Sequence, residues 1–155
     1  MIGLTTIGVV IGAHKILGDK SECYLDEDEK RDIKNTPVIW TLHHNKGIAC
    51  ENLKDKPNLV KIMSAGSLAG LIACLMLQFK NKGGWVSRLG LSLMIGGGIA
   101  NLADRLDDGE VTDYIQFKTD IPKIKKLVFN IADLAIIAGA LIFIISKIVR
   151  SLKKD

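Results

Sequence analysis

Two aspartates stand where a carboxylate could do chemistry. Asp133 lies in the string Phe-Asn-Ile-Ala-Asp, seven residues into an apolar block that runs from Leu127 to Val149. A carboxylate at membrane depth costs about 3 kcal/mol, so such residues usually face a bundle interior and have a function there. The structural alternative is that Asp133 pairs with a basic residue such as Arg105 and locks two helices together. Asp113 has a simpler alternative, as an acid in a surface loop.

A second polar cluster closes an earlier apolar block. Residues 96–105 read G-G-G-I-A-N-L-A-D-R and lead on to Asp113. Asn101 and Arg105 are four residues apart, so they share one face if the helix persists. We interpret the three glycines as packing residues, because glycine lets helix backbones approach closely in lipid.

Two aspartates with asparagine and arginine nearby indicate general acid–base chemistry on water. Two close carboxyls do not both ionise easily, so one keeps a proton and the other does not. The ionised carboxylate can take a proton from water as the water attacks a carbonyl, and the protonated one can donate to the carbonyl oxygen or the leaving nitrogen. We expect no metal, because His43 and His44 are adjacent and would point to opposite faces of a strand.

The apolar blocks that carry these groups are long enough to cross a membrane. The chain has 155 residues, of which 48% are hydrophobic and 25% charged, so the two kinds must be segregated. A spanning helix needs about 20 apolar residues, and we predict four spans, at about 2–17, 59–79, 85–103 and 127–149. For the first block the alternative is a cleaved signal peptide, disfavoured because no basic residue precedes it. A soluble bundle of very apolar helices is disfavoured because no polar stripe recurs at helical spacing.

Charge placement predicts the orientation. The 80–88 connection and the C-terminal tail are basic, whereas segments 18–58 and 104–126 mix both signs. Since short basic loops stay in the cytoplasm, both mixed segments are predicted outside, with Asp133 one to two turns below the outer surface. We expect residues 18–36 to form a solvated or flexible surface, 38–44 a short strand and 45–47 a turn. Three cysteines without a C-x-x-C pair exclude a disulfide framework, and nothing indicates nucleic-acid binding.

Three motifs in this order resemble lipoprotein signal peptidase, the signal peptidase II family of bacterial membrane aspartic peptidases. Residues 45–49, N-K-G-I-A, are similar to the family's N-x-G-x-A motif after a strand. Residues 96–114 are similar to its G-G-x-x-G-N-x-x-D-R-x-x-x-G-x-V-x-D-F motif, and residues 129–133 to F-N-x-A-D. One departure lies near the end of the first span, where the family has an Asp and, four residues later, a Lys. Here the nearest positions hold His14 and Gly18.

The resemblance implies a mainly α membrane protein, a four-transmembrane-helix bundle with a small extracytoplasmic β-rich element between helices 1 and 2. Residues 1–155 would form a single membrane-embedded peptidase domain in the bacterial cell membrane, with its active site on the extracytoplasmic side. It would cleave diacylglyceryl-modified prolipoproteins just before the lipidated cysteine, without a cofactor. Asp113 and Asp133 would be the catalytic pair. The implied substrate-binding residues are Asn45, Gly47, Asn101, Arg105 and Asn130.

The expected partners are lipid-modified prolipoproteins and membrane lipids, and we expect a monomer. Two other functions stay open. A non-catalytic relative would bind lipidated peptides without cutting them, an option raised by the missing acid of the first span. A small transporter subunit is disfavoured because no acid sits at mid-membrane.

Overall fold

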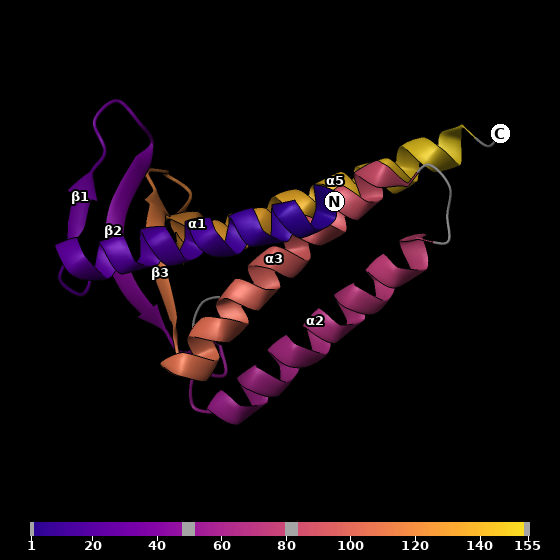
Figure 1. The fold of residues 1–155 in the computed structure, drawn as a ribbon. Helices are drawn as coiled ribbons and strands as arrows, with labels where there is room; N and C mark the ends of the chain where they lie inside the picture. Colours follow the sequence, from indigo (N-terminus) through magenta and orange to yellow (C-terminus); the bar gives the residue numbers. More distant parts are fainter. Residues whose placement is uncertain (1, 48–51, 80–83, 154–155) are drawn as a thin grey trace.

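The computed structural model describes residues 2–47, 52–79 and 84–153. Its four long helices are α1 (Ile2–Tyr24), α2 (Pro57–Phe79), α3 (Trp85–Asp107) and α5 (Ile131–Leu152). Each is long and apolar enough to cross a membrane. The four-helix architecture predicted from the sequence is therefore confirmed. The helices gather side by side, and a small sheet lies beyond one end of them (Figure 1).

The first helix is longer than the apolar block that predicted it. It continues from Leu17 to Tyr24, through residues that were expected to be a flexible surface. The polar residues of this extension make helical contacts: Lys15 pairs with Asp19 one turn later at 2.9 Å, and the Ser21 hydroxyl donates to the Leu17 carbonyl at 2.9 Å. The end of the apolar run is therefore not the end of the helix.

The sheet joins the two outer segments. It has four antiparallel strands in the order β1 (Lys30–Asp32), β2 (Val38–Asn45), β3 (Val111–Phe117) and β4 (Val128–Phe129). The first two strands follow α1, as expected for the β-rich element, and β2 contains the predicted strand. The other two strands come from the segment between α3 and α5, together with the short helix α4 (Pro122–Lys125). The sheet therefore brings residues 70 positions apart into register, such as His43 opposite Asp113.

Glycines set the closest helix contact, between α3 and α5. A Cβ on Gly97 would overlap the carbonyl oxygen of Ala132, and one on Gly90 would lie 2.7 Å from the carbonyl oxygen of Gly139. Gly98 differs, because its nearest neighbour would be a Leu68 methyl at 3.4 Å. The packing role predicted for the three consecutive glycines is therefore confirmed for two of them: Gly97 at the α3–α5 contact, and Gly96, where a Cβ would lie 3.0 Å from the Val10 side chain of α1. Gly98 turns towards α2.

The second helix stands apart from α5. It packs against α3, and among the described elements it has no comparable contact with α5. In Figure 1, α2 runs alongside α3 and diverges from α5 towards the sheet. At the last turn of α2, Lys147 of α5 donates to the Gln78 amide oxygen at 2.9 Å. At the same end, the guanidinium of Arg88 from α3 lies 5.4 Å from the centre of the Phe79 ring. Helices α2 and α5 are thus linked by a side-chain hydrogen bond at this end and separate towards the sheet.

The glycine contact gives a direct test of the fold. We expect Gly97→Ala to destabilise the protein by about 1–3 kcal/mol, because the added methyl meets backbone that has no room to move. Gly98→Ala on the neighbouring position meets only a side-chain methyl and should leave stability unchanged within about 0.5 kcal/mol. Thermal unfolding in detergent measures both variants, and equal transition temperatures would contradict a close contact of Gly97 with α5.

Candidate functional site

The start of α5 forms one side of the site. Asn130 is the N-cap residue of this helix, and its side-chain oxygen accepts from the Asp133 backbone N–H at 2.9 Å. In return, the Asp133 carboxylate accepts from the Asn130 backbone N–H at 3.2 Å. This reciprocal capping box fixes Asn130 as the point where α5 begins. The preceding Val128–Phe129, expected within the fourth span, form β4 instead. Asp133 lies in the first turn of α5, and its depth below the outer surface stays a prediction.

Asp113 faces this turn from β3. It is 1% exposed, so it is not the surface acid of the simpler alternative. Its two carboxylate oxygens accept from the Asn45 side-chain amide at 3.0 Å and from the Asn130 side-chain amide at 2.6 Å. Burial, followed by the charge of Asp133, raises the pKa of Asp113 to about 7, against the lowering effect of the two asparagine donors. Asp113 therefore exchanges its proton near neutral pH.

The last turns of α3 complete the cluster. Asn101 donates to the Asp133 carboxylate at 2.8 Å and accepts from the Asn130 amide at 3.1 Å. One turn later, Arg105 donates to the carbonyl oxygens of Asn101 and Gly47, at 3.1 and 2.9 Å. Among the described residues no ion pair joins Arg105 to Asp133, and the buried Nε–H of Arg105 has no partner there. The guanidinium is thus oriented by backbone and keeps a donor for another molecule.

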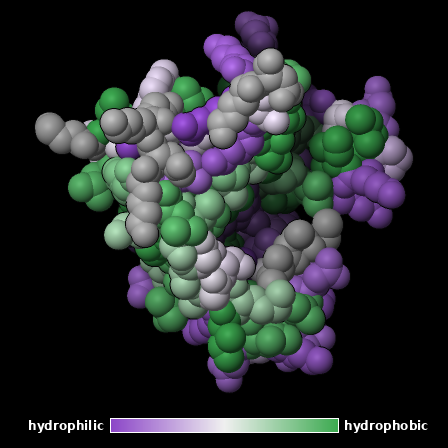
Figure 2. Space-filling view, turned by 90° about the vertical axis from the view of Figure 1, so that its right-hand side faces the viewer, coloured by the Kyte–Doolittle hydropathy of each residue, from purple (hydrophilic) through white to green (hydrophobic). Residues whose placement is uncertain are grey.

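These groups line a cavity of about 780 Å³ between the helices. Its polar end holds both aspartates, and its long wall is formed by apolar and small residues of α2, α3 and α5. The space-filling view shows a hollow with hydrophobic residues around it and hydrophilic residues at its depth (Figure 2). The residues of the long wall include Met63, Ser64, Ser67, Leu68, Leu71, Met94, Ile136 and Ile137.

All seven residues singled out from the sequence lie in this one cluster. Six are joined by the hydrogen bonds above through their side chains, and Gly47 joins through its carbonyl oxygen. Residues 48 and 49 of the N-K-G-I-A string, and residues 80–83 of the basic connection, lie outside the described residues. Sequence reasoning missed Tyr114, whose hydroxyl accepts from the Ile131 backbone N–H at 3.2 Å and so fixes β3 to the start of α5. A tyrosine adjacent to Asp113 was visible, but nothing in the sequence indicated its partner.

One set of side chains elsewhere could approach a metal ion. Ligand atoms of Glu27, Asp28 and His43 lie within 4.8 Å of one another. Both acids are exposed, and exposed acids commonly cluster without an ion, so we assign no metal site to them.

Comparison with known proteins places the chain among signal peptidases. Residues 15–149 match the family model for signal peptidase (SPase) II. A lipoprotein signal peptidase of Xanthomonas oryzae pv. oryzae is 37% identical over 116 residues, which cover 69% of this chain and 68% of the relative. One of Chlorobium phaeobacteroides is 33% identical over 127 residues, which cover 76% and 73%. A solved bacterial membrane enzyme superimposes with a TM-score of 0.83 at 22% identity, covering 99% of this chain and 91% of that one. The fold of that enzyme and the four apolar helices together describe a multi-pass membrane protein.

The raised pKa of Asp113 predicts a pH-dependent stability. The folded protein holds this proton up to about pH 7, whereas the unfolded chain releases it near the ordinary value of 3.8. Stability contributed by the neutral carboxyl is therefore complete below about pH 4 and is lost as the pH rises to about 7. We expect Asp113→Asn, which does not ionise, to gain on the order of 3 kcal/mol relative to wild type between pH 5 and pH 8.

Thermal unfolding in detergent at both pH values measures this difference. Asp120→Asn, in the exposed part of the same outer segment, is the matched control and should follow wild type. If Asp113→Asn also follows wild type, the burial of this carboxyl does not govern its proton.

Proposed function

This chain belongs to the signal peptidase II family, and from its site we propose that it is an aspartic endopeptidase that removes signal peptides from lipid-modified prolipoproteins. The observation that carries the proposal is that one asparagine, Asn130, binds both Asp113 and the turn of Asp133 at the end of a long apolar cavity. Two carboxyls at the end of a membrane cavity suit hydrolysis of a peptide that arrives attached to lipid.

We assign the acid to Asp113 and the base to Asp133. Asp113 carries a proton near neutral pH, because burial raises its pKa to about 7. Asp133 accepts a backbone N–H at the start of α5, where the helix dipole favours a negative charge. Asp133 takes a proton from water while the water oxygen bonds to the peptide carbonyl carbon, and Asp113 protonates the carbonyl oxygen.

The resulting tetrahedral diol then collapses. The carbon–nitrogen bond breaks as Asp133 gives its proton to the leaving nitrogen, and one diol hydroxyl returns a proton to Asp113. The products are a signal peptide with a new carboxyl group and a lipidated cysteine with a free amine. No covalent enzyme intermediate and no cofactor are needed in this route.

The remaining polar residues have binding roles in this proposal. The unpartnered Nε–H of Arg105 can donate to a substrate carbonyl, and Asn45, Asn101 and Asn130 hold the two carboxyls at a fixed spacing. Gly47 positions the guanidinium through its carbonyl oxygen. The apolar wall of the cavity suits the acyl chains and the signal-peptide helix, which places the cut just before the lipidated cysteine.

We also propose that residues 1–155 act as one peptidase domain, as a monomer in the bacterial cell membrane. The site would lie on the extracytoplasmic side, because the basic connection at 80–88 and the basic tail favour the cytoplasm. The sheet, whose strand β3 carries Asp113, and the start of α5, which carries Asp133, lie at the opposite end of the helices from the last turn of α2 and the first turn of α3 (Figure 1).

Substitution of either aspartate tests the catalytic assignment. We expect Asp113→Asn and Asp133→Asn each to lower cleavage of a synthetic diacylglyceryl lipopeptide by at least about 1000-fold, the size of a lost general acid or base. Asp120→Asn should keep the wild-type rate, and a chelator should change none of the rates. Mass spectrometry in ¹⁸O-water should find the label in the new carboxyl group.

Three outcomes would contradict the proposal. Unchanged cleavage by both aspartate variants would reject the catalytic pair. A wild-type protein that binds the lipopeptide and never cuts it would support the non-catalytic relative instead. Loss of activity with chelator, restored by a metal, would reject the route without a cofactor.

Cysteine labelling tests the orientation. Cys23 is exposed near the end of α1 and Cys74 lies within α2. In spheroplasts that express a Cys50→Ser variant, we expect a membrane-impermeant maleimide to label the protein without permeabilisation. Further replacement of Cys23 by Ser should abolish that label. Labelling that requires permeabilisation would place the site in the cytoplasm.

A further inference from the structure

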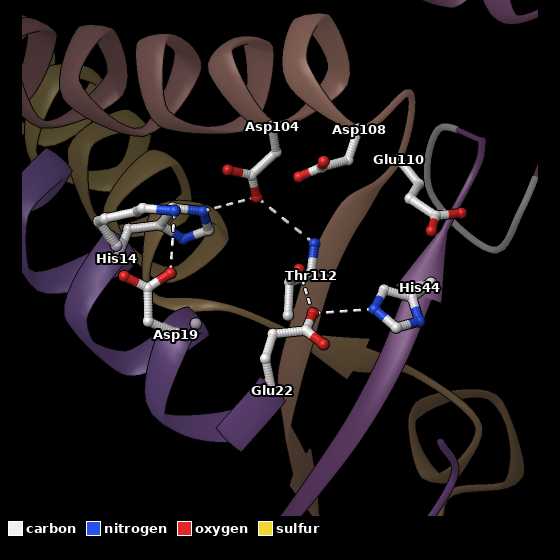
Figure 3. A pocket seen from close by; sticks show the side chains of 10 residues that line it. His14, Asp19, Glu22, His44, Asp104, Asp108, Glu110 and Thr112 are labelled. Atoms are coloured by element: carbon white, nitrogen blue, oxygen red, sulfur yellow. Dashed lines mark hydrogen bonds and ion pairs between the residues drawn. The ribbon is translucent and has the colours of Figure 1, made fainter. Parts of the chain in front are cut away.

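A second polar cavity lies behind the sheet, on the face opposite the aspartates. Side chains alternate along β2 and β3, so the paired residues His44 and Thr112 face away from Asn45 and Asp113. The cavity measures about 410 Å³, is open to solvent on one side and is lined by residues of the second half of α1, the end of α3 and the sheet. Figure 3 shows that its side chains come from these three parts.

One chain of contacts reaches Thr112 from α1 through α3. His14 is 3% exposed, and its Nε2 atom lies 2.9 Å from the Asp104 carboxylate. The same Asp104 oxygen accepts from the Thr112 backbone N–H at 3.4 Å. His14 therefore positions Asp104, and Asp104 binds the backbone N–H of Thr112, the residue before Asp113 (Figure 3).

A second chain of contacts reaches the Thr112 side chain. Its hydroxyl donates to the Glu22 carboxylate at 2.9 Å, and the same Glu22 oxygen lies 2.8 Å from Nε2 of His44. Burial opposes a charge on His44, but the hydrogen bond and charge of Glu22, joined by those of Glu27, outweigh it and raise the pKa of His44. Two histidine–carboxylate pairs thus meet on Thr112.

At residues 112 and 113 of the described sheet, β3 has a neighbouring strand on one side only, so the contacts of Thr112 add support that the sheet does not give. β4 pairs only with Ile115 and Gln116 of β3, so in the described sheet Asp113 has a strand neighbour only on the β2 side. The register with β2 is itself irregular between Trp40 and His43. The backbone at residues 112 and 113 is therefore held by one irregular ladder and by the contacts of Thr112.

We propose that Thr112, held by the His14–Asp104 and Glu22–His44 pairs, is a positioning residue that sets the location of Asp113 relative to Asp133. The inference rests on the proposed function, because it assigns a role in the same reaction. Thr112 acts through the peptide bond that it shares with Asp113. None of the four paired side chains lines the cavity that holds the aspartates. The two pairs bind different groups of Thr112: Asp104 accepts from its backbone N–H, and Glu22 accepts from its hydroxyl.

The test removes each arm and then restores it. Thr112→Val keeps the shape and loses the hydroxyl, so we expect kcat to fall about tenfold while KM stays within about twofold, because small displacements of reacting groups affect rate more than binding. Thr112→Ser should recover most of the rate. His14→Leu should behave like Thr112→Val, and His14→Gln, which retains a donor for Asp104, should recover part of the loss.

Thr36→Val, on the exposed turn between β1 and β2, is the matched control for general effects of replacing a threonine. A kcat within about twofold of wild type in both Thr112→Val and His14→Leu would overturn the inference. Equal losses in kcat and substrate affinity would also overturn it, because they would indicate a general disturbance of the fold.

A measurement without substrate separates this inference from the proposed function. The carboxyl stretching band of Asp113, identified by its loss in Asp113→Asn, can be titrated by infrared spectroscopy. Burial is the largest cause of the raised pKa of Asp113, so a loosened strand that admits water should lower the midpoint in Thr112→Val by at least about 0.5 pH units.

The charged groups that face Asp113 are the same in both proteins: Asp133 from α5, His43 from β2 and Arg105 from α3. A change in midpoint therefore reports position and hydration. If the wild type never cleaves lipopeptide but the midpoint shifts, the proposed function fails and the positioning role stands. An unshifted midpoint overturns the positioning role whether or not the enzyme is active.

Discussion

The side chain of Asn130 is the interaction on which the rest of the site depends. Its amide oxygen caps α5 through the Asp133 N–H, and its amide nitrogen donates to both Asn101 and Asp113. It is fully buried, so every one of these bonds replaces a bond to water, and an unfilled one would be costly. Because the same group ends a membrane helix and holds the strand carboxyl, the position of α5 and the geometry of the proposed catalytic pair are fixed together.

The sheet explains how two outer segments form a single site. β2 and β3 come from the two outer segments, on either side of α2 and α3 in the sequence, and their pairing places Asn45 beside the strand that carries Asp113. Glycines bring α3 and α5 close enough for Asn101 to reach Asp133. The polar cluster is therefore framed by a backbone ladder on one side and a close helix contact on the other.

Much of this arrangement could be predicted from the residues. Long apolar blocks predict spanning helices because the bilayer requires them, and the polar residues at the ends of these blocks predicted which side chains would lie together in one cluster. The polar extension of α1 could not be predicted, because the end of an apolar run reports a change of hydropathy and not where the helical hydrogen bonds stop. The two residues of β4 were hidden inside an apolar block, since only the cap at Asn130 separates them from α5. The contact of His14 with Asp104 joins residues 90 positions apart, and no local pattern records such a pair.

The divergence of α2 from α5 has a consequence for how substrate would be met. The cavity lies between walls that include Met63 of α2 and Ile137 of α5, and both of these side chains are about half exposed. A lipid-anchored chain could slide in sideways between them without leaving the bilayer. Enzyme and substrate would then meet by diffusion in the plane of the membrane. The encounter rate would depend on the mole fraction of substrate among the lipids, so added lipid would lower it and added water would not.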